Sequence, residues 1–403
     1  MKDFPIVGIG ASAGGLEAIS KLLNHLSVDT GMAYVIIQHL ERTHESHLAE
    51  ILSRNTKLPV KEITNKMRIE PNHIYTIPPN CAVALSNYTF NLSSRSGVLG
   101  QSIAIDFFFV SLAENKKNRA IGIILSGTAT DGTNGLKAIK SAGGTTFAQD
   151  PQTSKFDGMP RSAIASGVVD LVLSPEEIAT ELMRMAKHPY IKASEVEGGD
   201  IETYSEPGEA LRKIFSLLRT HTQVEFSSYK PTTVKRRIER QMMLHKIVSI
   251  EKYANYLKTS PESVKALYED IFIHVTEFFR DPHSFDSLQS HVFPLLVKNN
   301  TLETPIRIWV PGCSTGEEVY SLAISLFEFL VEKKISVQLQ IFATDISELA
   351  IQTARKGIYT AFQVRGVSEE RLNRFFDKIS EGYKIKKIIR DNCIFSRHDL
   401  ITT

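Results

Sequence analysis

Two short motifs in this chain place reactive side chains directly after apolar runs. In the first, Ile6–Gly10 leads into Ala11-Ser12-Ala-Gly-Gly, so a hydroxyl lies between an expected strand and an expected helix. In the second, Ile306–Val310 leads through Pro-Gly-Cys-Ser-Thr-Gly to the acid Glu317. A lone serine in such a turn is typical of a nucleophile, whereas an acid after a glycine-bearing turn is typical of nucleotide-type cofactor binding.

Ser12 has two candidate partners that also follow apolar strands. His39 comes after Tyr34–Gln38, and Asp131 comes after Ile121–Ser126. The carboxyl ends of parallel strands share one edge of a sheet, so these side chains are expected to lie close together. A hydroxyl, an imidazole and a carboxylate form a nucleophile–base–orienter triad, whose order along the chain is not fixed. Backbone N–H groups at the start of the following helix would stabilise an oxyanion.

Each of these residues also has a simpler interpretation. Gly8-x-Gly10 with the glycines after Ser12 partly matches a dinucleotide-binding loop, although position 13 is alanine. His39 alone is more often a capping or surface residue. Asp131 precedes Gly132 and would suit the cap of a helix that begins at Thr133. The residues alone therefore leave a hydrolase, a nucleotide-binding protein and a non-catalytic fold open.

The second motif gains an acid about 30 residues further on, where Ala343-Thr-Asp345 ends the next expected strand. A carboxylate at this position suits the two ribose hydroxyls of an adenosine, and a helix N-cap is the alternative. Upstream, Lys230, Arg237 and Arg240 are expected to share one face of a helix. Such a basic face is either solvent-exposed or binds an acidic partner, and the lack of interleaved aromatic residues disfavours nucleic acid.

The elements that position these residues alternate between strands and helices. Apolar strand patterns occur at 5–10, 33–38, 73–77, 81–85, 120–126, 145–148 and 169–173. Helical patterns separate them, which predicts an α/β fold with a doubly wound parallel sheet over 1–188. An acidic linker is expected at 189–208, an all-α domain at 209–285 and a partial Rossmann-like domain at 286–403. Thr276 and Arg280 are expected four residues apart on one helix of the all-α domain.

Composition excludes several classes of protein. The formal net charge is +2, hydrophobic residues make up 42% and charged residues 23%, as in ordinary globular domains. The three cysteines lie far apart, which disfavours a disulfide framework or a zinc site and is typical of the reducing cytoplasm. No apolar run reaches the length of a membrane helix, so direct membrane insertion is not expected.

Residues 5–185 resemble the catalytic domain of the chemotaxis protein-glutamate methylesterases (CheB type). The resemblance rests on Gly-Ala-Ser12-Ala-Gly-Gly, Val-Ile-Ile-Gln-His39-Leu, Leu125-Ser-Gly-Thr-Ala-Thr-Asp131-Gly and Phe156-Asp-Gly-Met-Pro-Arg-Ser-Ala, in that order. It implies ester hydrolysis without a cofactor, with Ser12, His39 and Asp131 as the catalytic residues. The family commonly has Gly-Met-Gly where this chain has Gly127-Thr-Ala, so a methionine near the site is missing from that loop.

Residues 207–403 resemble the chemoreceptor glutamate O-methyltransferases (CheR type). The matching stretches are the basic segment 226–240, His274-Val-Thr-Glu-Phe-Phe-Arg-Asp-Pro, Cys313-Ser-Thr-Gly-Glu-Glu-Val-Tyr-Ser and Ala343-Thr-Asp-Ile-Ser. S-adenosylmethionine is the implied cofactor. The cofactor-binding residues that the resemblance implies are His274, Thr276, Arg280, Glu317, Asp345, Asp399 and Leu400. Lys230, Arg237 and Arg240 match a basic helix that faces the receptor. A small β-insertion is expected near 376–395.

These observations predict a fusion of a receptor methylesterase and a receptor methyltransferase in chemotaxis-type signalling. The expected partner is a chemoreceptor-like methyl-accepting protein in the cytoplasm, and the oligomeric state stays open. The family continues beyond Asp399-Leu400, so the methyltransferase half is expected to be incomplete and inactive in this chain. A non-catalytic scaffold that binds receptor and nucleotide is the alternative.

Overall fold

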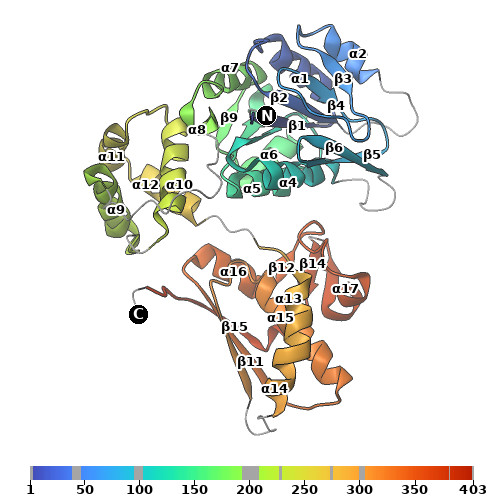
Figure 1. The fold of residues 1–403 in the computed structure, drawn as a ribbon, viewed down its shortest axis with the longest axis vertical. Coiled ribbons are helices and arrows are strands. Elements are labelled where there is room, and N and C mark those ends of the chain that lie inside the picture. Colours follow the sequence, from blue (N-terminus) through green and yellow to red (C-terminus); the bar gives the residue numbers. More distant parts are fainter. Residues whose placement is uncertain are drawn as a thin grey trace. The chain divides into compact units, whose positions relative to one another are not determined.

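The computed structural model describes residues 3–38, 47–94, 103–192, 208–226, 229–272, 276–298, 305–380 and 382–401. The chain forms two compact units (Figure 1). The first comprises residues 1–221 and 229–271, and the second comprises 222–228 and 272–403. Each unit is described by itself below.

A seven-stranded parallel sheet forms the centre of the first unit, in the order β3-β4-β2-β1-β7-β8-β9. Its strands are β1 (Ile6–Ala11), β2 (Ala33–Gln38), β3 (Val60–Glu62), β4 (Ile74–Thr76), β7 (Ala120–Ile124), β8 (Thr145–Gln149) and β9 (Leu171–Leu173). Every residue of β1 is buried, because helices cover both faces of the sheet and a doubly covered strand must be apolar throughout. The predicted doubly wound α/β fold is confirmed.

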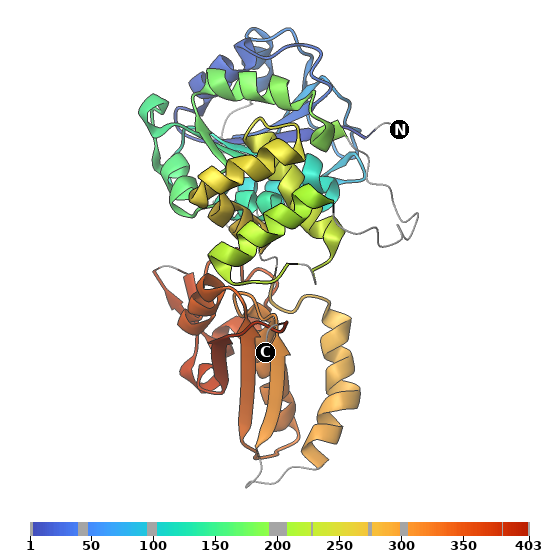
Figure 2. The same ribbon diagram turned by 90° about the vertical axis from the view of Figure 1, so that its left-hand side faces the viewer.

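Helices pack on both faces of this sheet (Figures 1 and 2). The helices α1 (Gly15–Asn24), α2 (Leu48–Ser53) and α7 (Pro175–Met185) contribute to the apolar core on one face. On the other face lie α4 (Ala104–Lys116), α5 (Thr133–Ser141) and α6 (Gly158–Ala165). The hairpin β5 (Cys81–Ser86) and β6 (Thr89–Ser94) forms a separate antiparallel pair that packs on α4. The sequence patterns predicted β5 as a strand but not its antiparallel pairing.

The all-α segment packs with the sheet domain in the same unit. Its helices are α9 (Glu209–Thr222), α10 (Pro231–Leu244), α11 (Ile250–Thr259) and α12 (Pro261–Ile271). The boundary to the second unit therefore lies near 272, not at the expected 285. Residues 189–192 of the expected linker form α8 (Pro189–Lys192), which buries Tyr190 and Ile191 in the first unit. The rest of that linker, 193–207, lies outside the described residues.

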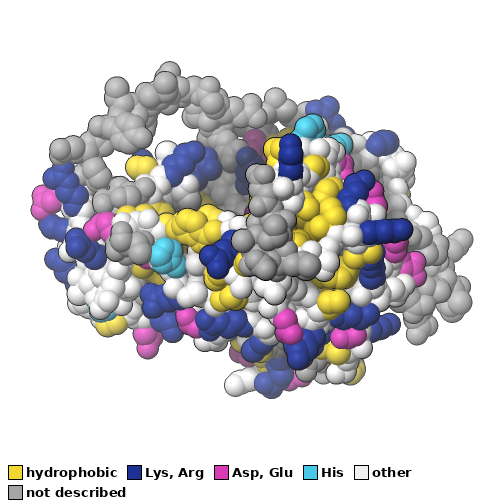
Figure 3. All heavy atoms as spheres, turned by 90° about the horizontal axis from the view of Figure 1, so that it is seen from below, with side chains coloured by type: hydrophobic (Ala, Val, Ile, Leu, Met, Phe, Trp, Pro, Cys, Tyr) yellow, Lys and Arg dark blue, Asp and Glu magenta, His cyan; other side chains and the backbone are white. Residues whose placement is uncertain are grey.

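The second unit contains a parallel sheet in the order β10-β11-β15, formed by Ile306–Pro311, Leu339–Asp345 and Cys393–Arg397. Its helices are α13 (Pro282–Ser287), α14 (Phe293–Lys298), α15 (Glu317–Glu332), α16 (Glu348–Lys356), α17 (Glu369–Phe375) and α18 (Lys387–Arg390). A small antiparallel sheet joins β12 (Ile358–Tyr359), β14 (Gly382–Ile385) and β13 (Phe376–Ile379). β13 and β14 lie within the region expected for the β-insertion, whereas β12 precedes it. Acidic and basic side chains are interspersed on the face seen in Figure 3.

Candidate functional site

The Ser12 turn lies at the carboxyl end of β1, where the strand order changes direction. β2 pairs with one edge of β1 and β7 with the other, which makes this point a topological switch where open α/β sheets bind ligands. The backbone N–H of Ser12 donates to the carbonyl of Ser126 over 3.0 Å. Gly14, with φ of 72°, adopts the left-handed conformation that lets α1 begin at Gly15. The turn is thus fixed to the end of β7 by a backbone hydrogen bond.

Two N–H groups of this turn have no hydrogen-bond acceptor among the described residues. The N–H of Ser12 is used by Ser126, and the N–H of Gly15 donates to the Ser12 carbonyl over 2.9 Å. Within the part of the chain that the structure describes, no acceptor is paired with the N–H of Ala13 or of Gly14. The oxyanion donors expected at this helix start are therefore Ala13 and Gly14, and not Ser12 itself.

His39 lies outside the described residues, and Gln38, the residue before it in the sequence, is the last residue of β2. Ala11, which precedes Ser12, pairs with Gln38, which precedes His39. The two predicted catalytic residues therefore follow directly opposed positions of adjacent parallel strands. The Gln38 side chain also lies near the start of α1, since its Nε2 atom is 4.0 Å from where a Cβ on Gly15 would stand.

Asp131 lies after the neighbouring strand β7 and is only 3% exposed. Its two carboxylate oxygens accept the backbone N–H groups of Ile105 and Asp106, each over 3.0 Å. Asp131 therefore caps the first turn of α4, whereas its alternative role as the cap of the helix from Thr133 is not observed. Asp131 is thus held in a fixed position by the first turn of α4.

A second buried acid, Asp106, completes the arrangement around Asp131. Its carboxylate accepts the N–H of Gly135 over 2.6 Å and the side chain of Asn134 over 3.2 Å, at the start of α5. Asp131 thus caps α4, the helix that carries Asp106, and Asp106 caps α5, the helix that follows Asp131. Burial, and then the nearby Asp131 carboxylate, raise the pKa of Asp106 to about 7. Asp106 was not predicted as a site residue, since a single acid in an apolar helix pattern gives no sign of a partner 25 residues away.

Two further residues around Ser12 were not singled out from the sequence. The Ser126 hydroxyl donates to the carbonyl of Ala13 over 2.9 Å and accepts the N–H of Phe156 over 3.0 Å. Met159 is fully buried beside Gly127, where an added Cβ would stand 2.2 Å from its sulfur and 2.9 Å from the Cβ of Ser12. A methionine therefore does lie near the site, although it comes from the Phe156-Asp-Gly-Met stretch and not from the loop before Asp131.

The glycines that suggested a dinucleotide loop have a packing role. A Cβ on Gly8 would stand 2.7 Å from the Phe109 ring, and one on Gly10 would stand 2.5 Å from Ile105. Both positions lie within β1 and face α4, so they allow the helix to approach the sheet closely. This observation removes the main support for a phosphate-binding loop in the first unit.

The second motif forms a turn between β10 and α15 in the second unit. Ser314 and Gly316 have φ values of 50° and 95°, and Gly316 directly precedes the first residue of the helix, Glu317. The Asp345 carboxylate at the end of β11 accepts the N–H of Ser314 and of Ser347, each over 2.8 Å. Asp345 therefore holds the turn in place.

Glu317 is 2% exposed and is held by two side chains. Its carboxylate accepts the hydroxyl of Thr315 over 2.6 Å and the amide of Gln363 over 3.4 Å. Tyr359 donates its hydroxyl to the Thr315 carbonyl over 2.8 Å, so the turn is also supported from β12. Burial, and then Asp345, raise the pKa of the Cys313 thiol to about 12, which keeps it protonated and unreactive.

The residues of this turn fit an adenosine-type cofactor on two observations. The Ser314 hydroxyl is buried and has no hydrogen-bond partner among the described residues, which is a costly state that a polar ligand group would relieve. A Cβ on Gly312 would meet no atom within 4 Å, so the backbone there is open to close approach. The Asp345 and Glu317 carboxylates accept donors from Ser314 and Thr315 of this turn and are both buried.

The other expected cofactor residues are only partly described. His274 lies outside the described residues. Thr276 and Arg280 are not on a helix, so the expected helical pair is wrong: Asp281 precedes Pro282 and has φ of 57°, and a residue before proline is disfavoured in helical conformation. The segment between them is anchored near the turn, since the N–H of Phe279 donates to Ser321 of α15 over 2.9 Å.

Asp399 and Leu400 follow β15, the third strand of this sheet. Asp399 is partly exposed and accepts the N–H of Ile401 over 2.9 Å, while 53% of Leu400 is exposed.

The structure contradicts the expected receptor-facing role of two arginines. Arg240 is completely buried and the Arg237 side chain is 13% exposed, because both point from α10 into the first unit. Only Lys230 of the predicted basic set is exposed. A basic helical pattern carries no information about buried acidic partners. The sequence therefore could not distinguish an exposed arginine face from one that is buried against the sheet domain.

No group of metal-ligating side chains was found among the described residues. The three cysteines are not paired in disulfides. In the described segments, no helix has the length and apolar character that crossing a membrane requires.

Comparisons with known proteins match three successive parts of the chain. Residues 7–182 match the model of the CheB methylesterase domain. A putative protein-glutamate methylesterase/protein-glutamine glutaminase of Leptospira interrogans is 35% identical over 184 residues, which cover 45% of this chain and 95% of that protein. The chain belongs to the CheB methylesterase family. Residues 209–272 match the all-alpha domain of CheR methyltransferases, and 274–403 match their SAM binding domain, so the predicted fusion is confirmed.

Longer relatives share both parts of this CheB–CheR fusion or only one. An uncharacterized 104.1 kDa protein of Rhodobacter capsulatus is 35% identical over 372 residues, covering 88% of this chain and 39% of that protein. A methylesterase/glutaminase of Rhizobium meliloti is 36% identical over 183 residues, or 52% of its length. The chain thus spans about two fifths to half of these relatives. The crystal structure of the Thermotoga maritima CheB methylesterase catalytic domain, 30% identical, covers 45% of this chain and 99% of that one, with a TM-score of 0.42.

Proposed function

We propose that the first unit hydrolyses glutamate γ-methyl esters on a chemoreceptor-like protein. The observation that supports this most is the strand register, which sets Ser12 and His39 after opposed residues of β1 and β2, with Asp131 after β7 on the other side. Three adjacent strands then supply a nucleophile, a base and an orienting carboxylate to one switch point.

In the proposed reaction the Ser12 oxygen attacks the ester carbonyl while His39 takes the serine proton. The oxyanion accepts the N–H groups of Ala13 and Gly14, and methanol leaves with the proton from His39. Water then attacks the acyl-enzyme and gives a proton to His39, which passes it to the Ser12 oxygen as the acyl bond breaks. The released glutamic acid side chain loses its own proton to solvent and becomes a carboxylate. Asp131 holds the imidazole in one tautomer. No cofactor takes part in this scheme.

The test is methanol release from an acidic helical peptide that carries glutamate methyl esters. Ser12→Ala should abolish release, because the nucleophile is lost, whereas Ser53→Ala, at an exposed serine, should leave the rate unchanged. Unchanged release by Ser12→Ala, or none by the parent chain, would exclude the mechanism. The relatives' names also include a glutaminase activity, so ammonia release from a glutamine peptide belongs in the same assay.

We propose that the second unit binds S-adenosylmethionine for methyl transfer to a receptor glutamate. The cofactor supplies an electrophilic methyl group when bound. Glu317 and Asp345 would hold ribose or amino groups, and Ser314 would donate its buried hydroxyl. The acceptor carboxylate is already nucleophilic, so the protein has to position it more than activate it.

Cofactor binding can be tested apart from turnover by titration calorimetry with S-adenosylhomocysteine. Ser314→Ala should weaken binding by about tenfold, because one hydrogen bond from a buried hydroxyl to the ligand is lost. Ser290→Ala, at an exposed serine, should leave the affinity unchanged. Equal affinities of the two variants and the parent chain would refute the assignment of Ser314. As the partner of both units we propose a methyl-accepting receptor in the reducing cytoplasm, where unpaired cysteines persist.

A further inference from the structure

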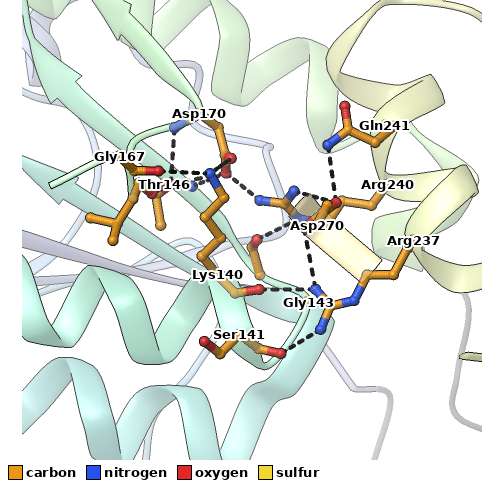
Figure 4. Close-up of polar contacts among 12 residues, drawn as sticks. Lys140, Ser141, Gly143, Thr146, Gly167, Asp170, Arg237, Arg240, Gln241 and Asp270 are labelled. Carbon is orange, nitrogen blue, oxygen red and sulfur yellow. Dashed lines mark hydrogen bonds and ion pairs between the residues drawn. The ribbon is translucent and has the colours of Figure 1, made fainter. Parts of the chain in front are cut away.

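Arg240 of α10 is the largest fully buried side chain of the protein's described part. Figure 4 shows its guanidinium between the sheet domain and the helical domain. It donates to the carbonyl of Gly144 over 2.9 Å and to Asp270 of α12 over 2.8 Å, and it pairs with Asp170 of the sheet domain. One guanidinium therefore joins the turn before β8, the residue before β9 and the last turn of α12.

Arg237, one turn earlier on α10, binds the end of another helix. Its guanidinium donates to the carbonyls of Lys140 and Ser141 over 3.0 and 2.6 Å. These carbonyls lie in the last turn of α5, where a helix carries partial negative charge, and the Lys140 carbonyl also accepts the N–H of Gly143 over 3.0 Å. The same guanidinium lies 3.5 Å from Asp270. Arg237 therefore acts as the C-terminal cap of a helix from the other domain.

Asp170 is the acid of the sheet domain in this cluster (Figure 4). It accepts the N–H and the hydroxyl of Thr146, each over 2.9 Å, and pairs with Lys140 over 3.2 Å. Burial alone would raise the pKa of Asp170, but Arg240 and Lys140 outweigh it and hold that pKa below its ordinary value. The carboxylate is therefore charged and fully provided with donors, as a buried ion pair requires.

The contact between α10 and the sheet domain includes several charged residues and an apolar side chain. Three cations, Arg237, Arg240 and Lys140, face the two carboxylates Asp170 and Asp270, and backbone carbonyls accept the excess donors. Next to them, Met243 of α10 is fully buried within the apolar core of the sheet domain. Its carbonyl also accepts from Arg184 of α7 over 2.9 Å.

We propose that the arginine face of α10 is a permanent docking surface for the esterase domain of the same chain, and that it does not bind the receptor. An acidic partner would have to remove Arg240 from two carboxylates, and a buried charge left without its partner is strongly destabilising. The helical domain is then a fixed part of the esterase. Receptor recognition by α10 is limited to its exposed side, which carries Lys235, and to the exposed Lys230 that directly precedes the helix. This inference is independent of catalysis by either unit.

Hydrogen exchange on the full chain tests the inference. Arg240→Ala should raise the exchange rates of amides in 143–146 and 167–170 of the esterase domain by at least about tenfold, because one partner of a buried ion pair is lost. Lys235→Ala, at an exposed lysine of the same helix, should change them less than about twofold. Unchanged exchange of the esterase segments in Arg240→Ala would overturn the proposal.

Asp170→Asn tests the same contact from the other domain, and it also serves if Arg240→Ala fails to fold. This change in the esterase should speed exchange in α10 and α12, and an effect confined to the esterase would contradict docking. Affinity for an acidic helical peptide supplies a second readout. Arg237→Ala should bind the peptide as the parent does, and a tenfold loss with esterase exchange unaltered would instead support a receptor-binding arginine face.

Discussion

Gly127→Ala should slow ester hydrolysis strongly while leaving the fold largely intact. The added Cβ would stand 2.2 Å from the sulfur of Met159 and 2.9 Å from the Cβ of Ser12, whereas ordinary contacts begin near 3.4 Å. The flexible side chain of Met159 can move. The Ser12 Cβ cannot move by rotation about χ1, so its turn must shift by about 0.5 Å or more, against the hydrogen bond to Ser126.

Such overpacking typically costs about 1–3 kcal/mol of stability, and a misplacement near 1 Å can cost about a hundredfold in rate. We therefore expect methanol release to fall by about ten- to a hundredfold, with a modest decrease in the urea midpoint. Gly208→Ala is the control, since a Cβ there meets no atom within 4 Å. Full activity of folded Gly127→Ala would refute the argument that glycine is needed to place the nucleophile.

Two further predictions concern buried acids. Burial and Asp131 raise the pKa of Asp106 from 3.8 to about 7, so the folded chain keeps a proton there that the unfolded chain loses, and the free energy of unfolding falls as pH rises through this window. Between pH 5 and pH 8, the free energy of unfolding measured in urea should decrease less for Asp106→Asn than for the parent. Equal decreases would contradict the raised pKa of Asp106. Asp345→Asn leaves one of two N–H donors unpaired and should lower the free energy of unfolding of the second unit by about 1–3 kcal/mol. Asp391→Asn, at an exposed acid, should change it little, and denaturant unfolding of both variants measures the difference.

The sequence predicted the sheet that carries the esterase site because its strands are buried on both faces. A run such as Ile6–Ala11 can only be a covered strand, and polar residues after three such runs then share one edge. The donors to Asp131 could not be predicted in this way. They come from the start of α4, about 25 residues earlier, and only the packing of α4 against α5 brings them together.

The second unit and the basic helix were predicted less completely for a different reason. The turn before Glu317 follows from local glycines and strand ends. The pairing of β12, β13 and β14 depends on contacts between distant short segments without a strong alternating pattern. Arg240 has the sequence signature of a solvent-exposed cation, and its carboxylate partners lie 30 and 70 residues away. The local sequence pattern therefore predicted the helix α10, but it did not predict that the side carrying Arg240 is buried.

These separations also bear on the order in which the first unit folds. Contacts between residues 70 to 96 positions apart close long loops, and the entropy of closing them is lost before the contacts stabilise anything. Asp170 and the end of α5 must already be in place before the arginines have anything to bind. Docking of α10 is thus expected late in folding. In a nascent chain that ends before residue 240, the sheet domain would expose the apolar surface that Met243 covers in the complete unit.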